Sequence, residues 1–170
     1  MKRRFIEWFA ALASLLCLTS AQAALNVLAC EPEWAALVTE LAGDRARVTS
    51  ATTARQDPHH IEARPSLIAR ARNADLLVCT GAELEIGWLP LLQRESGNPR
   101  IQVGQPGHFE AASQARLIEK LAQANRAMSD VHPGGNPHLH ADPRNLARVA
   151  DALGRRLAEL DPANAAHYNA

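Results

Sequence analysis

The sequence predicts an α/β fold, a parallel sheet with helices on both faces. Short apolar runs recur along the chain and alternate with segments whose apolar residues are spaced three or four apart, as on one side of a helix. The runs are apolar throughout, which is typical of strands buried on both faces of a parallel sheet. A length of 170 residues suits one well-buried domain and is too short for two of full size.

Four segments are expected to form the strands of this sheet. They are short and rich in apolar or β-branched residues, and most are followed by Gly, Pro or polar residues. In chain order they are residues 26–29, 47–51, 76–79 and 100–103.

Helices are expected between these strands and after the last one. They cover residues 34–41, a segment that Pro65 opens, residues 86–95 with a break at Pro90, and a stretch around 112–128. The strongest helical pattern follows Asp142, the expected N-cap, and residues 163–170 have helix-forming composition. That strongest pattern places five apolar residues on one face: Leu146, Val149, Leu153, Leu157 and Leu160.

A cleavable signal peptide is expected at residues 1–23. Residues 2–4 (Lys-Arg-Arg) give a basic start, a mostly apolar run follows, and residues 21–23 (Ala-Gln-Ala) have the small residues of a cleavage site. The apolar run is shorter than the roughly 20 residues of a membrane span. Leu16 before Cys17 fits a lipoprotein signal poorly. The sequence therefore predicts export to the periplasm.

Composition and the remaining cysteines narrow the chemistry. The formal charge is zero and aromatic residues make up 4%, so a nucleic-acid partner is not expected. Cys30 and Cys79 each end a predicted strand. In an exported protein they form either a disulfide or two buried free thiols, and the sequence leaves both open. A thiolate zinc site is not expected, because no CxxC spacing is present.

Histidines gather in two proline-containing stretches. Residues 131–143 (V-H-P-G-G-N-P-H-L-H-A-D-P) hold three of them, and prolines and glycines keep this stretch out of regular structure. The motif Asp/Asn-Pro-His occurs twice, at residues 57–59 and 136–138. Imidazole is the commonest transition-metal side-chain ligand. The first motif follows a predicted strand, where ligands of parallel sheets bind. We therefore expect the two loops to meet at one metal site.

These motifs resemble those of the metal-specific periplasmic solute-binding proteins, which deliver zinc or manganese to ABC importers. Residues 57–66 (D-P-H-H-I-E-A-R-P-S) match the family's D-P-H-x-[FY]-E-x-x-P-S loop, with Ile61 in place of the aromatic residue. Residues 136–143 match its D/N-P-H-x-W-L-D-P loop, and residues 74–90 resemble the segment between the two. The resemblance covers residues 25–170.

The resemblance implies that His59 and His138 are the first two metal ligands. His140 stands where the family has Trp, and it is a candidate extra or substitute ligand because alternate residues of an extended segment project together. His60 and Glu62 are expected behind the ligands, as hydrogen-bond partners. The other histidines are expected to be surface residues: His108, His132 and His167.

In the resembling family, a third His and a carboxylate come from a second α/β domain reached through a long helix. Residues 24–143 are therefore expected to form the N-terminal metal-binding lobe, and residues 144–170 the start of the linker helix, with the second lobe absent. Without that lobe the apolar stripe of the helix is expected to be exposed. Such exposure favours self-association of a fragment.

The expected function is capture of a divalent transition metal in the periplasm for delivery to an ABC-type import permease. Imidazole ligands favour Zn²⁺, and Mn²⁺ is the alternative cargo. The chain is not expected to be an enzyme. Two alternatives stay open: a metal-dependent hydrolase with Glu62 as its base, although no HExxH pair is present, and a truncated product with impaired metal binding.

Overall fold

The computed structural model describes residues 23–120 and 132–169. The predicted signal peptide therefore lies outside the described residues, except for Ala23. None of the helices in the described part of the chain is both long and apolar enough to span a membrane.

Four parallel strands form the sheet, in the order β2-β1-β3-β4. Their bounds are Leu25–Ala29 for β1, Ala46–Ser50 for β2, Leu76–Cys79 for β3 and His108–Glu110 for β4. Register is set by apolar partners, for example Val27 opposite both Val48 and Leu76. The predicted fold class and the first three strands are confirmed.

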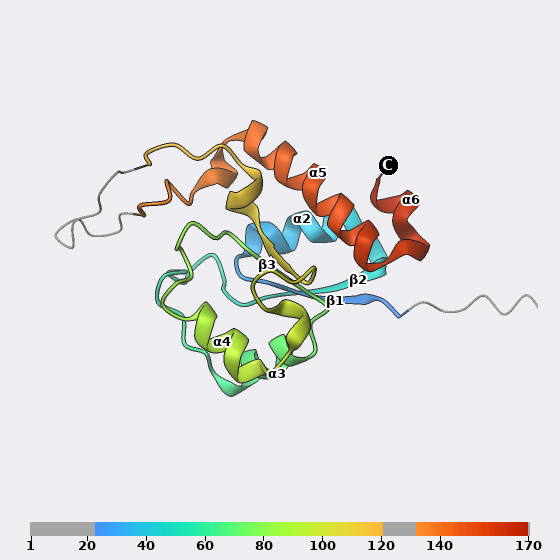
Figure 1. Ribbon diagram of the computed structural model, residues 1–170, viewed down its shortest axis with the longest axis horizontal. Helices are drawn as coiled ribbons and strands as arrows, with labels where there is room; N and C mark the ends of the chain where they lie inside the picture. The colour runs from blue at the N-terminus through green and yellow to red at the C-terminus, as the bar shows by residue number, and fades with distance from the viewer. Residues whose placement is uncertain (1–22, 121–131, 170) are drawn as a thin grey trace, which may run out of the picture.

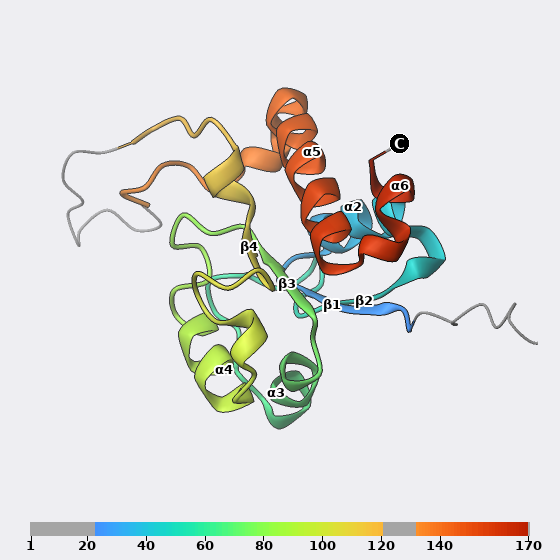
Figure 2. The same ribbon diagram turned by 45° about the vertical axis from the view of Figure 1, so that its right-hand side comes forward.

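Helices cover both faces of this sheet (Figures 1 and 2). One face carries α2 (Pro32–Ala42), α5 (Pro143–Leu160) and α6 (Ala165–Tyr168). The other face carries α3 (Pro65–Arg72) and α4 (Leu89–Ser96). Side chains along β1 alternate between two buried apolar clusters, one under each helical layer. Short 3₁₀ turns connect the elements: Gly43–Arg45, Pro99–Ile101, Ala111–Gln114, Leu139–Ala141 and Pro162–Asn164.

Two predicted elements are wrong. Residues 100–103 are not the fourth strand: they end the turn Pro99–Ile101 and leave Val103 74% exposed, while β4 forms later. The helix expected around residues 112–128 does not form in its described part, since the turn Ala111–Gln114 gives way to irregular chain through residue 120. The side chain of Asn145 accepts a hydrogen bond from Arg116 N (2.9 Å) and donates one to Arg116 O (3.1 Å). These bonds occupy the backbone groups that a helix would use.

Helix α4 also begins later than predicted. Pro90 lies in its first turn, where a missing N–H costs nothing, and does not break it.

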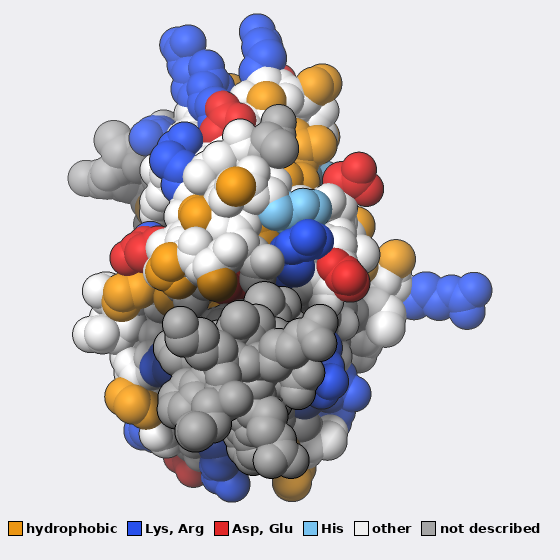
Figure 3. Space-filling model, turned by 90° about the vertical axis from the view of Figure 1, so that its right-hand side faces the viewer, with side chains coloured by type: hydrophobic (Ala, Val, Ile, Leu, Met, Phe, Trp, Pro, Cys, Tyr) orange, Lys and Arg blue, Asp and Glu red, His pale blue; other side chains and the backbone are white. Residues whose placement is uncertain are grey.

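Helix α5 confirms the predicted cap and corrects the predicted exposure. The Asp142 carboxylate accepts a hydrogen bond from Arg144 N at 2.9 Å. Val149, Leu153 and Leu157 are fully buried in the apolar cluster between α5, α2 and the sheet. The expectation that this stripe is exposed is wrong, and it gives no reason for self-association. On the visible part of the face at the amino ends of the strands, hydrophobic side chains lie scattered among charged ones (Figure 3).

The loops at the carboxyl ends of the strands position the histidines. Because all four strands are parallel, the loops after them leave at one edge, on the left of Figure 1. The chain continues from β1 to β2 on one side and returns to β3 on the other, so the strand order reverses between β1 and β3. Ligand sites of such sheets lie at this point.

Candidate metal centre

The first histidine loop, residues 57–62, is organised by Asp57. Its Oδ1 accepts a hydrogen bond from His59 N at 2.9 Å and lies 2.7 Å from His59 Nδ1. These donors hold the pKa of Asp57 well below its usual range. A carboxylate that accepts from Nδ1–H leaves Nε2 as the lone-pair nitrogen of a neutral imidazole. Asp57 therefore leaves His59 Nε2 as the nitrogen available to a metal ion.

Asp57 also contacts the second histidine of this loop. Its Oδ2 lies 3.0 Å from His60 Nδ1, and the His60 side chain is 79% exposed. Glu62 is exposed, and no hydrogen bond joins it to an imidazole within the described residues. The carboxylate that contacts the ring of His59 is thus that of Asp57.

The segment after β3 holds the first histidine loop in place. Buried Trp88 donates its Nε1–H to the carbonyl of Pro58 at 2.7 Å. Gly87 lets the two segments approach closely, because a Cβ there would lie 3.1 Å from the carbonyl oxygen of His59. The backbone around His59 is therefore fixed from two sides.

The second histidine loop, residues 132–142, repeats the same turn. Asn136 Oδ1 accepts a hydrogen bond from His138 N at 2.9 Å. Asn136 N donates to the carbonyl of Ile118 at 2.9 Å, and its Nδ2 donates to Glu119 Oε2 at 2.8 Å. A pocket of about 320 Å³ lies beside exposed His138, lined on its apolar side by Leu117, Ile118 and Leu139.

His140 turns toward helix α2. Its Nδ1 lies 3.3 Å from Glu33 Oε1, and its ring meets Trp34 edge-on at 6.4 Å between centroids. The rings of His138 and His140 are 6.1 Å apart. A Glu33 carboxylate therefore competes with any metal for His140.

The structure instead brings His132 to His59, which the sequence did not indicate. Their Nε2 atoms are 3.0 Å apart and their rings stack at 5.2 Å between centroids. Burial lowers the pKa of His132, and the nearby His59 and His138 lower it further. His132 is therefore not the surface histidine that was expected. His108 is also buried, with 6% of its side chain exposed.

Two buried carboxyl groups lie beneath the loops, at the ends of β1 and β3. Glu31 and Glu85 are each 2% exposed. Glu85 accepts hydrogen bonds from the N–H groups of Thr80 (2.7 Å) and Gly81 (3.1 Å), while Glu31 accepts one from the Thr80 hydroxyl at 3.0 Å. Burial and the neighbouring Glu85 raise the pKa of Glu31 to about 9. Burial also raises the pKa of Glu85, against the lowering effect of the hydrogen bonds that it accepts.

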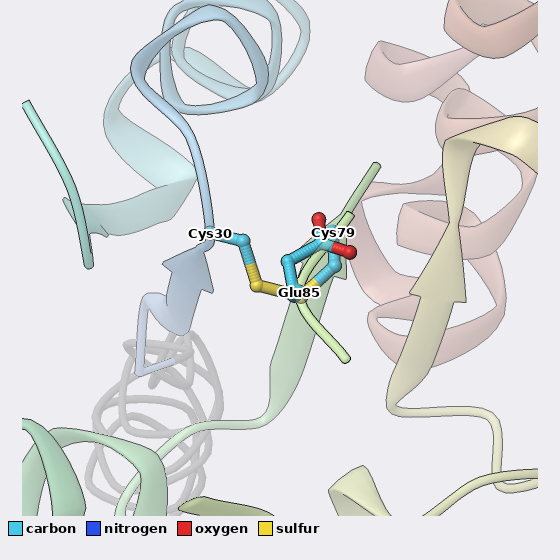
Figure 4. A group of neighbouring side chains, drawn as sticks. All are labelled: Cys30, Cys79 and Glu85. Atoms are coloured by element: carbon cyan, nitrogen blue, oxygen red, sulfur yellow. A yellow bond between two sulfur atoms is a disulfide. The ribbon is translucent and has the colours of Figure 1, made fainter. Parts of the chain in front are cut away.

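Cys30 and Cys79 form a disulfide, which settles the choice that the sequence left open. With Glu85 they are the one group of three or more metal-ligating atoms within 4.8 Å of one another among the described residues (Figure 4). Their sulfurs are bonded to each other and offer no thiolate. No three histidine nitrogens in the described ranges gather this closely.

Residues 27–170 match the family described as zinc-uptake complex component A, periplasmic (ZnuA). The chain belongs to the ZnuA family. The resemblance stated from the sequence is confirmed.

Curated relatives of this ZnuA-family chain include two streptococcal lipoproteins. The metal ABC transporter substrate-binding lipoprotein ScbA of Streptococcus cristatus is 26% identical over 144 residues, 85% of this chain and 44% of the relative. The manganese ABC transporter substrate-binding lipoprotein ScaA of Streptococcus gordonii is 28% identical over 152 residues, 88% of this chain and 46% of the relative. The chain thus spans less than half the length of these relatives.

Solved structures share the fold of this ZnuA-family chain. A crystal structure of ZnuA aligns with a TM-score of 0.67 at 24% identity, covering 85% of this chain and 50% of the other. The Mn-bound periplasmic metal-binding protein of Candidatus Liberibacter asiaticus aligns with a TM-score of 0.67 at 23% identity, covering 85% and 48%. The α/β lobe described above is therefore the fold of about half of such a protein.

Proposed function

We propose that this chain captures a divalent transition metal, Zn²⁺ in the first place, in the periplasm and delivers it to the permease of an ABC importer. The observation that carries the proposal is the repeated turn. Asp57 and Asn136 each accept a hydrogen bond from the N–H of a histidine two residues later, at 2.9 Å in both cases. Two loops built alike therefore each fix the backbone of a histidine that is a candidate metal ligand.

Ligand chemistry supports zinc over manganese as the cargo. Imidazole suits Zn²⁺, whereas Mn²⁺ is better served by carboxylate, carbonyl and water oxygens. The Asp57 carboxylate is used by His59 and His60. ScaA carries manganese in its name, so Mn²⁺ is the competing cargo. Water, or the second lobe that the family resemblance implies, would fill the remaining positions.

A competition titration tests this function. The purified chain is titrated with Zn²⁺ and with Mn²⁺ against a chromophoric chelator, and a variant with both His59→Ala and His138→Ala serves as the control. We expect one equivalent of Zn²⁺ bound at least about 100-fold more tightly than Mn²⁺, and lost in the control. Preference for Mn²⁺, or zinc binding that survives in the control, would contradict the proposal.

A further inference from the structure

We propose that His132 is a third imidazole ligand of this centre, and that His132 Nε2 and His59 Nε2 bind the same divalent transition ion. The proposal deepens the metal-capture function proposed above and rests on it. It assigns to the second histidine loop a ligand outside the Asn-Pro-His turn.

The distance between the two nitrogens is the first argument. The two Nε2 atoms lie 3.0 Å apart. Two imidazole nitrogens on one tetrahedral Zn²⁺ are about 3.3 Å apart, because each Zn–N bond is about 2.0–2.1 Å long. A small rotation of either ring therefore suffices to place both nitrogens on one ion.

The position of the proton on the His59 ring is the second argument. Asp57 uses the Nδ1–H of His59, so His59 Nε2 carries a lone pair when the ring is neutral. His132 Nε2 lies 3.0 Å from this nitrogen, so the lone pair of His59 faces His132. A cation that replaces the proton between the two nitrogens would be bound by both.

The third argument is that the segment after β3 lies against both histidine loops, since a Cβ at Gly134 would lie 3.8 Å from Ala82 Cα. Gly81, Ala82 and Glu83 all have positive φ (75°, 52° and 68°), a conformation that is costly for non-glycine residues. Buried Glu85 fixes the start of this turn through the N–H groups of Thr80 and Gly81. The same segment ends at Trp88, which bonds to Pro58 beside His59. The meeting of the two imidazoles is therefore built into the segment after β3.

His140, the extra ligand considered from the sequence, is less suited to this position. Glu33 Oε1 lies 3.3 Å from its Nδ1 and holds it against α2. Within the described residues, the hydrogen-bond partner of His132 Nε2 is His59 Nε2 itself, and the ion would replace that contact. An imidazole set of His59, His132 and His138 also strengthens the preference for zinc.

X-ray absorption at the zinc K-edge tests the proposal directly, because multiple scattering counts the imidazoles on the ion. The purified chain with one equivalent of Zn²⁺ is compared with His132→Ala and with a matched control, His167→Ala, an exposed histidine on α6. We expect three imidazoles in the parent and control, two in His132→Ala, and at least a tenfold lower zinc affinity for that variant. Thermal unfolding checks that all variants fold.

A second variant gives a positive signal that does not depend on a loss of affinity or of an imidazole. In His132→Cys a thiolate replaces the imidazole, and we expect a Zn–S shell at about 2.3 Å. An unchanged imidazole count and affinity in His132→Ala, with no Zn–S shell in His132→Cys, would overturn the role of His132 while leaving metal capture intact. Zinc binding that is absent, or indifferent to His59 and His138, would overturn both proposals.

Discussion

The two histidine loops begin with the same turn but surround their imidazoles differently. In the first loop, a charged Asp57 contacts the backbone and ring of His59 and the ring of His60. In the second loop, neutral Asn136 contacts only the backbone of His138 and gives its amide to Glu119. The shared motif therefore fixes the backbone of both loops, whereas the charge of its first residue decides whether the imidazole is also oriented.

Removing either turn histidine is expected to have the largest effect on zinc affinity. We expect His59→Ala and His138→Ala each to weaken binding more than about 100-fold, since both remove a ligand, and His60→Ala to weaken it less than tenfold. The His60 side chain is largely exposed and touches the site only through Asp57. Chelator competition measures all three. Equal losses at the three positions would refute this assignment.

Exchanging the first residues of the two turns tests whether the charge of that residue accounts for the difference between the loops. We expect Asp57→Asn to lower zinc affinity about 10–100-fold, as loss of a hydrogen-bond partner behind a metal ligand does. Asn136→Asp places a carboxylate beside Glu119 and is expected to lower stability without improving binding. Asp44→Asn, at an exposed acid just before the amino end of β2, is the control. If Asp57→Asn binds zinc like the parent, the first loop does not depend on its charge.

A smaller effect is expected when the hydrogen bond between Trp88 and the first histidine loop is removed. Trp88→Phe keeps the aromatic ring and loses the hydrogen bond to Pro58, and we expect a few-fold loss of zinc affinity and a stability loss of about 1 kcal/mol. Trp34→Phe is the matched control, since it loses a buried bond of 2.8 Å to Thr80 that does not reach this loop. Urea unfolding and chelator competition give both quantities. Equal changes in affinity for the two variants would show that the Trp88–Pro58 hydrogen bond has no specific effect on zinc binding.

The smallest effect on binding is expected beneath the loops, where Glu31→Gln changes stability instead. The folded-state pKa of Glu31 is about 9, above its ordinary value of 4.5, so the folded state holds a proton that the unfolded state releases. The parent's stability therefore falls as pH rises from about 4.5 to about 9. Glutamine stays neutral, and we expect the variant to be more stable at pH 8 by at least about 1 kcal/mol, with unchanged zinc affinity.

Urea unfolding between pH 5 and pH 9 measures this difference. The control is Glu33→Gln, whose carboxylate is 30% exposed at the start of the same helix. Parallel stability curves for Glu31→Gln and the parent would show that Glu31 is not the proton-holding group.

The sequence was sufficient where local chemistry decides the structure. The apolar runs predicted β1, β2 and β3, and Asp142 with Pro143 predicted the start of α5. The strand β4 could not be found, because its three residues, His-Phe-Glu, carry no pattern and form a strand through pairing with β3. The helix expected after it fails because Asn145, far along the chain, takes the backbone groups of Arg116.

The site was predictable only in part, for a similar reason. Proline and the Asx side chain act over two residues, so both turns could be predicted from their motifs. The contact of His59 with His132 joins residues 73 apart in sequence, and a single histidine before a proline carries no sign of it. Glu62 was expected behind His59 because it shares the motif. Asp57 contacts the ring of His59 because its turn points its carboxylate at that ring.

The disulfide between Cys30 and Cys79 gives the two histidine loops different topological positions. It closes residues 30–79 into a covalent ring, and the first histidine loop lies inside this ring while the second lies outside. In the chain-entropy description, closing a ring of this size is worth about 4 kcal/mol. When the fold opens locally, the first loop stays tethered to the ends of β1 and β3, whereas the second is released with its noncovalent contacts. Reduction of the disulfide would remove this difference in tethering between the two loops. The difference therefore persists only in an oxidising compartment.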